Sequence, residues 1–210
     1  MKKYLIILII SLAVINIVTL FYFSRYKETQ SLYLEALQPK LEQAMSMQEN
    51  MEAGFQNNCM KLDSVTCLDK DGDSIDLRSL FSNERERILI CRFSELDCES
   101  CIHYSISKMQ EHVGNIGKEN ILFVASYFNN KMLEPHIKLY GIDSFAVLNA
   151  KDLSIPIEDW NKPYYCVLDS SLQISDLFIP SKTASHIQQI YFDSIVNKYF
   201  SKAKDDENKS

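Results

Sequence analysis

The 210-residue chain lacks several features that would place it in familiar classes of protein. It has no long lysine or arginine run, and its formal net charge of −6 argues against nucleic acid as the main partner. No glycine-rich phosphate-binding motif occurs, so the sequence predicts no bound nucleotide cofactor. Six cysteines are too few for a disulfide scaffold of this length. With 46% hydrophobic and 24% charged residues, the chain is not disordered throughout, and its length suits one packed domain with attachments.

Apolar residues are concentrated at the N-terminus. Residues 4–23 contain no charge, and Lys2, Lys3, Arg25 and Lys27 flank them. At about 1.5 Å of rise per residue, a helix of that length crosses the hydrocarbon core of about 30 Å. We therefore expect residues 1–27 to be an uncleaved transmembrane anchor, with the long C-terminal part outside the cytoplasm. A cleaved signal peptide is the main alternative, although no small-residue cleavage site follows, and a buried soluble helix is another.

Residues 28–60 are predicted to form a helical stalk. Their apolar residues recur at helical spacing of three and four: Leu34, Leu37, Leu41, Ala44, Met51 and Phe55. Pro39 is expected to kink this helix or divide it in two. The apolar side of the stalk is expected to pack on the following domain, and a short dimerising coiled coil is the alternative.

Residues 61–200 alternate between strand and helix patterns, which predicts an α/β fold: a central mixed sheet flanked by helices. The expected strands are 64–68 and 74–77, which form a hairpin, and 87–93, 120–127, 146–148, 164–168 and 173–178. The expected helices are 99–114, 132–140 and 183–200. Residues 201–210 are charged and polar, and are expected to be a disordered tail.

Cys98-Glu99-Ser100-Cys101 is the motif that carries chemistry. Two intervening residues in the first turn of a helix let the two sulfurs form a disulfide. Cys98, at the helix start, meets unpaired N–H groups and the positive end of the helix dipole, which stabilise a thiolate. The pattern therefore indicates an attacking thiolate followed by a second thiol that resolves the mixed disulfide.

From about residue 62 to 200 the chain resembles the membrane-anchored thioredoxin-like thiol–disulfide oxidoreductases (TlpA/ResA-like). The resemblance rests on the segments VTCLDKDGDSIDL, RILICRFSELDCESC and NKPYYCVLDSSLQISDLF. It implies a thioredoxin-like fold in which Cys98 is the exposed nucleophile and Cys101 is the resolving thiol. It also implies that Pro163 is a cis-proline of the substrate groove.

The motif departs from the family pattern at several neighbours. Asp97 stands where the family usually has tryptophan, and Arg92 stands where many thioredoxins have a buried acid that helps to move protons. Asp97 and Glu99 should oppose the ionisation of Cys98, which favours a less acidic thiol and a reductant or isomerase role. His103 is a further candidate modulator of Cys98. These departures leave open a structural disulfide, or a redox-inactive binding module on the same fold and tether.

Other uses of cysteine are less well supported. No second Cys-x-x-Cys supplies a fourth zinc ligand beside Cys98, Cys101 and His103, so the sequence predicts no metal site. Ile102 stands where a haem-attachment motif requires histidine. A further disulfide between Cys59 and Cys67 is left open, and the other cysteines are expected to pack in strands.

The sequence therefore predicts a thiol–disulfide oxidoreductase tethered to the cytoplasmic membrane of a bacterium, with its domain on the extracytoplasmic, periplasmic side. By the resemblance, its partners are a disulfide-containing protein substrate and a membrane protein that donates electrons.

Overall fold

The computed structural model describes residues 2–62, 65–82 and 85–201. Beyond Ser201, the expected tail lies outside this range. The chain divides into two compact units, Met1–Ala44 and Met45–Ser210. A single helix, α1 (Lys2–Asn57), begins in the first unit and ends in the second.

Helix α1 contains Pro39 and is nevertheless continuous, so the predicted division at this proline is wrong. Proline removes one backbone hydrogen bond, and the many other bonds of a 56-residue helix hold it on both sides. An 18-residue window of α1 has a mean hydropathy of 2.7 and is wholly exposed. The helix is therefore long and apolar enough to cross a membrane, a property that signal sequences share.

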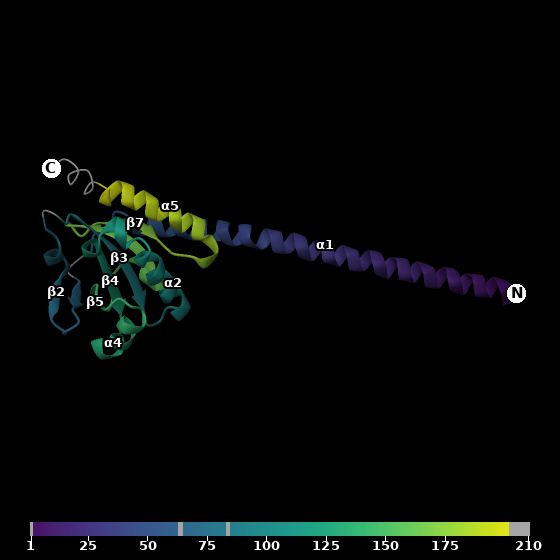
Figure 1. Cartoon of the computed structure of the whole chain (residues 1–210), viewed down its shortest axis with the longest axis horizontal. Coiled ribbons are helices and arrows are strands. Elements are labelled where there is room, and N and C mark those ends of the chain that lie inside the picture. Colours follow the sequence, from purple (N-terminus) through teal and green to yellow (C-terminus); the bar gives the residue numbers. More distant parts are fainter. Residues whose placement is uncertain (1, 63–64, 83–84, 202–210) are drawn as a thin grey trace. The chain divides into compact units, whose positions relative to one another are not determined.

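The described part of the second unit contains a seven-stranded mixed sheet in the order β2-β1-β5-β4-β3-β6-β7 (Figure 1). Its parallel centre consists of β3 (Arg87–Ser94), β4 (Ile121–Ser126) and β5 (Ala146–Asn149). Two antiparallel hairpins flank this centre: β1 (Thr66–Leu68) with β2 (Ser74–Asp76), and β6 (Tyr164–Asp169) with β7 (Ile174–Phe178). The first hairpin, the strands of the second and the mixed sheet agree with the prediction.

The helices of this unit are α2 (Glu99–Gln110), α3 (Val113–Ile116), α4 (Asn130–Leu139) and α5 (Ser185–Ile195), and a π turn (Val196–Phe200) continues α5. Short 3₁₀ turns cover Leu77–Leu80, Lys118–Asn120, Pro156–Trp160 and Lys182–Ala184. The predicted helix 99–114 is thus two helices, α2 and α3.

Strand β3 is apolar on both faces because a hydrophobic core covers each of them. Leu89, Cys91 and Phe93 point to one core, which contains residues of α2, α4 and α5. Ile88 and Ile90 point to the other, which contains the end of α1 and the segment 150–157. Arg92 continues the second series and so directs a charged side chain toward that face of the sheet.

The last turns of α1 contact the domain through a face of small and polar residues. Asn57 is 0% exposed; its Oδ1 accepts the Ile157 N–H at 3.0 Å. Asn50 both accepts from and donates to the backbone of Ile179, at 2.7 and 3.2 Å. Met51 and Phe55 are 60% and 83% exposed, so the expectation that these apolar residues pack on the domain is wrong. The buried face of α1 is instead the stripe that contains Asn50, Ala53 and Asn57. The two asparagines can lie on this face because backbone groups of the domain satisfy their side chains.

Candidate active site

The Cys-x-x-Cys segment follows a tight turn at the end of β3. The Asp97 carboxylate accepts the Ser94 N–H at 2.8 Å, and the Asp97 N–H donates back to the Ser94 carbonyl at 3.0 Å. Cys98 then occupies the N-cap position of α2. Its carbonyl accepts the N–H groups of Cys101 and Ile102 at 2.8 and 3.0 Å, as the first turn of the helix begins. The turn therefore places Cys98 at the helix start that the sequence predicts for it.

The two thiols of the motif differ in exposure and acidity. Cys98 is exposed and Cys101 is half-buried, and both are free thiols. The neighbouring Cys101 thiol, followed by the Ser100 hydroxyl at 3.2 Å from Sγ, lowers the pKa of Cys98 to about 7. Burial and the proximity of Cys98 raise the pKa of Cys101. Cys98 is thus the thiol that ionises first, as a nucleophile must.

The two acidic neighbours of Cys98 do not act as the sequence suggests. The Asp97 carboxylate is directed to the Ser94 N–H, and Glu99 is exposed. Burial raises the pKa of Asp97 to about 6, while the Ser94 N–H and Arg92 oppose that rise. Thiol and hydroxyl neighbours, rather than these carboxylates, dominate the shift in the pKa of Cys98.

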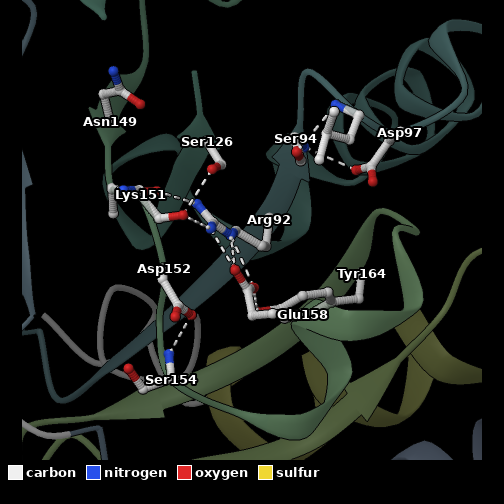
Figure 2. Close-up of polar contacts among 12 residues, drawn as sticks. Arg92, Ser94, Asp97, Ser126, Asn149, Lys151, Asp152, Ser154, Glu158 and Tyr164 are labelled. Atoms are coloured by element: carbon white, nitrogen blue, oxygen red, sulfur yellow. Dashed lines mark hydrogen bonds and ion pairs between the residues drawn. The ribbon is translucent and has the colours of Figure 1, made fainter. Parts of the chain in front are cut away.

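Arg92, on β3, lies in a hydrogen-bond network with Glu158 and the Ala150 carbonyl (Figure 2). Its guanidinium pairs with Glu158 through both carboxylate oxygens, with Nε–O distances of 3.0 and 3.2 Å. Nη1 also donates to the Ala150 carbonyl at 2.8 Å, and the Tyr164 hydroxyl donates to Glu158 at 2.6 Å. Arg92 therefore has an acidic partner and is not an isolated buried charge. The apolar surroundings of Arg92 indicate that it needs an acidic partner, but nothing in the sequence singles out Glu158.

The peptide bond before Pro163 differs from the prediction, whereas the modulating role of His103 stays a prediction. No peptide bond among the described residues is cis, so the expected cis peptide before Pro163 is absent and the prediction of a cis-proline is wrong. The backbone reverses just before it, at Asn161, with φ 50° and ψ 50°. Pro163 itself is buried. The exposed His103 ring lies edge-on to Tyr140 at 6.4 Å between centroids.

Sequence reasoning missed Lys182, which lies in the loop after β7. Its Nζ donates to the Ser100 hydroxyl at 2.8 Å, across 82 positions of sequence. Its charge also lowers the pKa of Cys101, against the larger opposing effect of burial. No motif or spacing marks this lysine, because only the packing of the loop onto α2 brings it to the cysteines.

The remaining cysteines are free thiols. Cys59 is exposed, whereas Cys67, Cys91 and Cys166 are buried. Burial raises the pKa of Cys67 to about 11 and that of Cys166 to about 12, and it also raises the pKa of Cys91. These three thiols are therefore protonated and packed in the cores. Among the described residues, no cluster of three or more His, Cys, Asp or Glu is placed to hold a metal.

No protein-family profile and no curated protein matches the chain. Solved structures do. A thiol:disulfide interchange protein from Bacteroides sp. is 14% identical with a TM-score of 0.50, over 70% of this chain and 92% of that one. A thioredoxin-like protein from Porphyromonas gingivalis is 15% identical with a TM-score of 0.48, over 68% and 96% of the two chains.

A further match is the thioredoxin domain of a thiol-disulfide oxidoreductase from Bacteroides vulgatus, 12% identical with a TM-score of 0.47, over 64% and 97% of the chains. At these identities a likeness shows the fold alone. Together with the strand order, the Bacteroides sp. structure shows a thioredoxin-like fold, which confirms the predicted fold class.

Proposed function

We propose that this chain of thioredoxin-like fold is a membrane-tethered, extracytoplasmic thiol–disulfide oxidoreductase of the TlpA/ResA kind. The observation that carries the proposal is the asymmetry of the dithiol. Cys98 is exposed with its pKa lowered to about 7, and the half-buried Cys101 one turn later has a raised pKa. A binding module has no need of such an asymmetry, whereas a two-step exchange reaction requires it.

The reaction follows from these two thiols. The Cys98 thiolate attacks one sulfur of a substrate disulfide, forms a mixed disulfide and releases the other substrate sulfur as a thiolate. Cys101 then loses its proton and attacks the Cys98 sulfur, which releases the second substrate thiol. The substrate gains two electrons, and the chain retains a Cys98–Cys101 disulfide. A membrane protein that donates a thiol pair returns this disulfide to the dithiol.

Trapping of the mixed disulfide tests the proposal. Replacing Cys101 with alanine removes the second step, so Cys101→Ala should accumulate mixed disulfides through Cys98 that are visible on non-reducing gels. Cys59→Ala is the matched control, because it removes another exposed cysteine and should trap nothing. The wild type should also reduce a model protein disulfide such as that of insulin. If neither trapping nor insulin reduction occurs, the redox-inactive binding module is the better assignment.

The exposed apolar part of α1 supports the tether. An 18-residue window with a mean hydropathy of 2.7 is long enough to serve as a span. We expect the full-length chain to stay in the membrane fraction after carbonate extraction in a bacterial host. We also expect the exposed thiol of Cys59 to react with a membrane-impermeant maleimide in intact spheroplasts. Release by carbonate contradicts the tether, and labelling only after lysis contradicts the extracytoplasmic location.

A further inference from the structure

Lys182, Ser100 and Cys98 form a chain of polar contacts that crosses from the loop after β7 to α2. Lys182 Nζ lies 2.8 Å from Ser100 Oγ, and Ser100 Oγ lies 3.2 Å from Cys98 Sγ. An ammonium group has donors only, so the serine oxygen must accept from Lys182. The single hydroxyl hydrogen of Ser100 is then free to donate to Cys98. The direction of the first hydrogen bond is thereby fixed, and once Cys98 is a thiolate, which can only accept, Ser100 must be the donor of the second.

From this geometry we propose that Lys182 is a positioning residue that stabilises the Cys98 thiolate through the Ser100 hydroxyl. The proposal deepens, and rests on, the proposed oxidoreductase function. A hydroxyl that accepts a hydrogen bond from a cation is a stronger donor than a free one. Its hydrogen is directed at the sulfur that becomes negative. The contact therefore favours the charged form of Cys98 over the neutral thiol.

Independent contacts hold the loop that carries Lys182. The Tyr104 hydroxyl of α2 donates to the Ser181 carbonyl at 3.2 Å, next to Lys182. Asn50 in the last part of α1 pairs with the Ile179 backbone on both its N–H and its carbonyl, at 2.7 and 3.2 Å. Because both ends of the segment 179–182 are fixed to neighbouring helices, less conformational entropy is lost when Lys182 reaches Ser100.

The other charged groups around the motif do not duplicate this role. Asp97, in the turn before α2, is bonded to the Ser94 N–H. Arg92 of β3 is paired with Glu158, which lies in the 3₁₀ turn Pro156–Trp160. Glu99 on α2 is exposed, the His103 ring lies edge-on to Tyr140, and the Cys101 thiol is the titratable group with the largest effect on the pKa of Cys98. Lys182 is the cation that the described structure places in contact with the Cys-x-x-Cys segment, and its charge also lowers the pKa of Cys101.

The pH profile of Cys98 alkylation tests this role without requiring oxidoreductase turnover. The full-length, detergent-solubilised and pre-reduced chain is treated with iodoacetamide from pH 5 to 9. Mass spectrometry of fragment ions then follows Cys98 separately from Cys101. Lys182→Met should raise the apparent pKa of Cys98 by about half a unit, because an exposed charge contact is screened by water, and should slow alkylation at pH 6 about threefold. Lys182→Arg should keep most of the wild-type profile.

Two further variants separate positioning from a general effect of charge. Lys138→Met removes the same charge from α4, where Lys138 pairs with Glu134, and should leave the profile unchanged. Ser100→Ala should raise the pKa of Cys98, and adding Lys182→Met to it should raise the pKa little further, because the intermediary is gone. An unchanged profile in Lys182→Met, an equal shift in Lys138→Met, or full additivity with Ser100→Ala each overturns the proposal. Alkylation is scored apart from trapping and insulin reduction. A chain that shows the expected alkylation profiles but neither traps a partner nor reduces insulin therefore refutes the proposed function and leaves the effect of Lys182 on Cys98 standing.

Discussion

Replacing Glu158 with glutamine should strongly destabilise the domain. The Arg92 side chain is 2% exposed, and the Glu158 side chain is 17% exposed. Removing one partner of a buried ion pair leaves an uncompensated charge, at a cost of about 3–5 kcal/mol. Arg92 keeps its bond to the Ala150 carbonyl in the variant, and Glu158 is partly solvated. We therefore expect a loss of about 3 kcal/mol, at the lower end of that range.

The size of the effect can be measured and divided between the two partners. Trp160, the single tryptophan, lies two positions from Glu158 and reports urea-induced unfolding of this region by its fluorescence. Arg92→Met should cost a similar amount, because it leaves Glu158 without its cation. The double variant Arg92→Met/Glu158→Gln should lose about 2 kcal/mol less than the two single losses added together. Tyr164→Phe, which removes one hydrogen bond to the same carboxylate, should cost about 1 kcal/mol.

Two results would refute this reasoning. If Glu158→Gln loses less than about 1 kcal/mol, Arg92 has enough other acceptors or water to be stable without its carboxylate. If the losses in the double variant add fully, the two side chains do not depend on each other, and the network in Figure 2 has little energetic meaning.

Two further predictions concern the turn before Cys98 and the end of α1. Burial raises the pKa of Asp97 to about 6, so the folded protein holds this proton more tightly than the unfolded chain. The wild-type domain therefore loses stability as the pH rises from about 4 to 6, whereas Asp97→Asn, which does not titrate, should not. The free energy of unfolding of the variant minus that of wild type should be about 1–2 kcal/mol larger at pH 7 than at pH 4. An equal difference at both pH values would contradict this. Asn57→Ala removes a buried side chain that is hydrogen-bonded to the backbone of Ile157 and Ala53, and it should lower the free energy of unfolding by about 2–3 kcal/mol. The control Gln56→Ala, on the exposed side of α1, should change this free energy by less than about 0.5 kcal/mol.

Much of the fold follows from local patterns. The apolar runs at 87–93 and 120–127, and the turn residues between 68 and 74, are strong signals because strands and hairpins depend on neighbouring residues. The helix start at Cys98 is predictable because a strand pattern precedes the motif and helical spacing follows it.

The features that sequence reasoning missed depend on partners far along the chain. Glu158 and Lys182 meet Arg92 and Ser100 across 66 and 82 positions. Apolar spacing normally marks the buried side of a helix and so points to a stripe that ends at Met51 and Phe55, both of which are exposed. Buried Asn57 instead bonds a backbone N–H across 100 positions, and no helical pattern shows that partner.

The network around Arg92 also constrains the order in which the domain can assemble. Arg92 belongs to β3 in the parallel part of the sheet, yet its acceptors at Ala150 and Glu158 lie 58 and 66 positions further along. Asn57 depends on the same late segment through Ile157. Until residues 150–158 have docked, Arg92 lacks both its acidic partner and its carbonyl acceptor, so closing the core over it is unfavourable. Contacts of this sequence separation are slow to form, and Lys182, which completes the surroundings of the dithiol, lies later still in the chain.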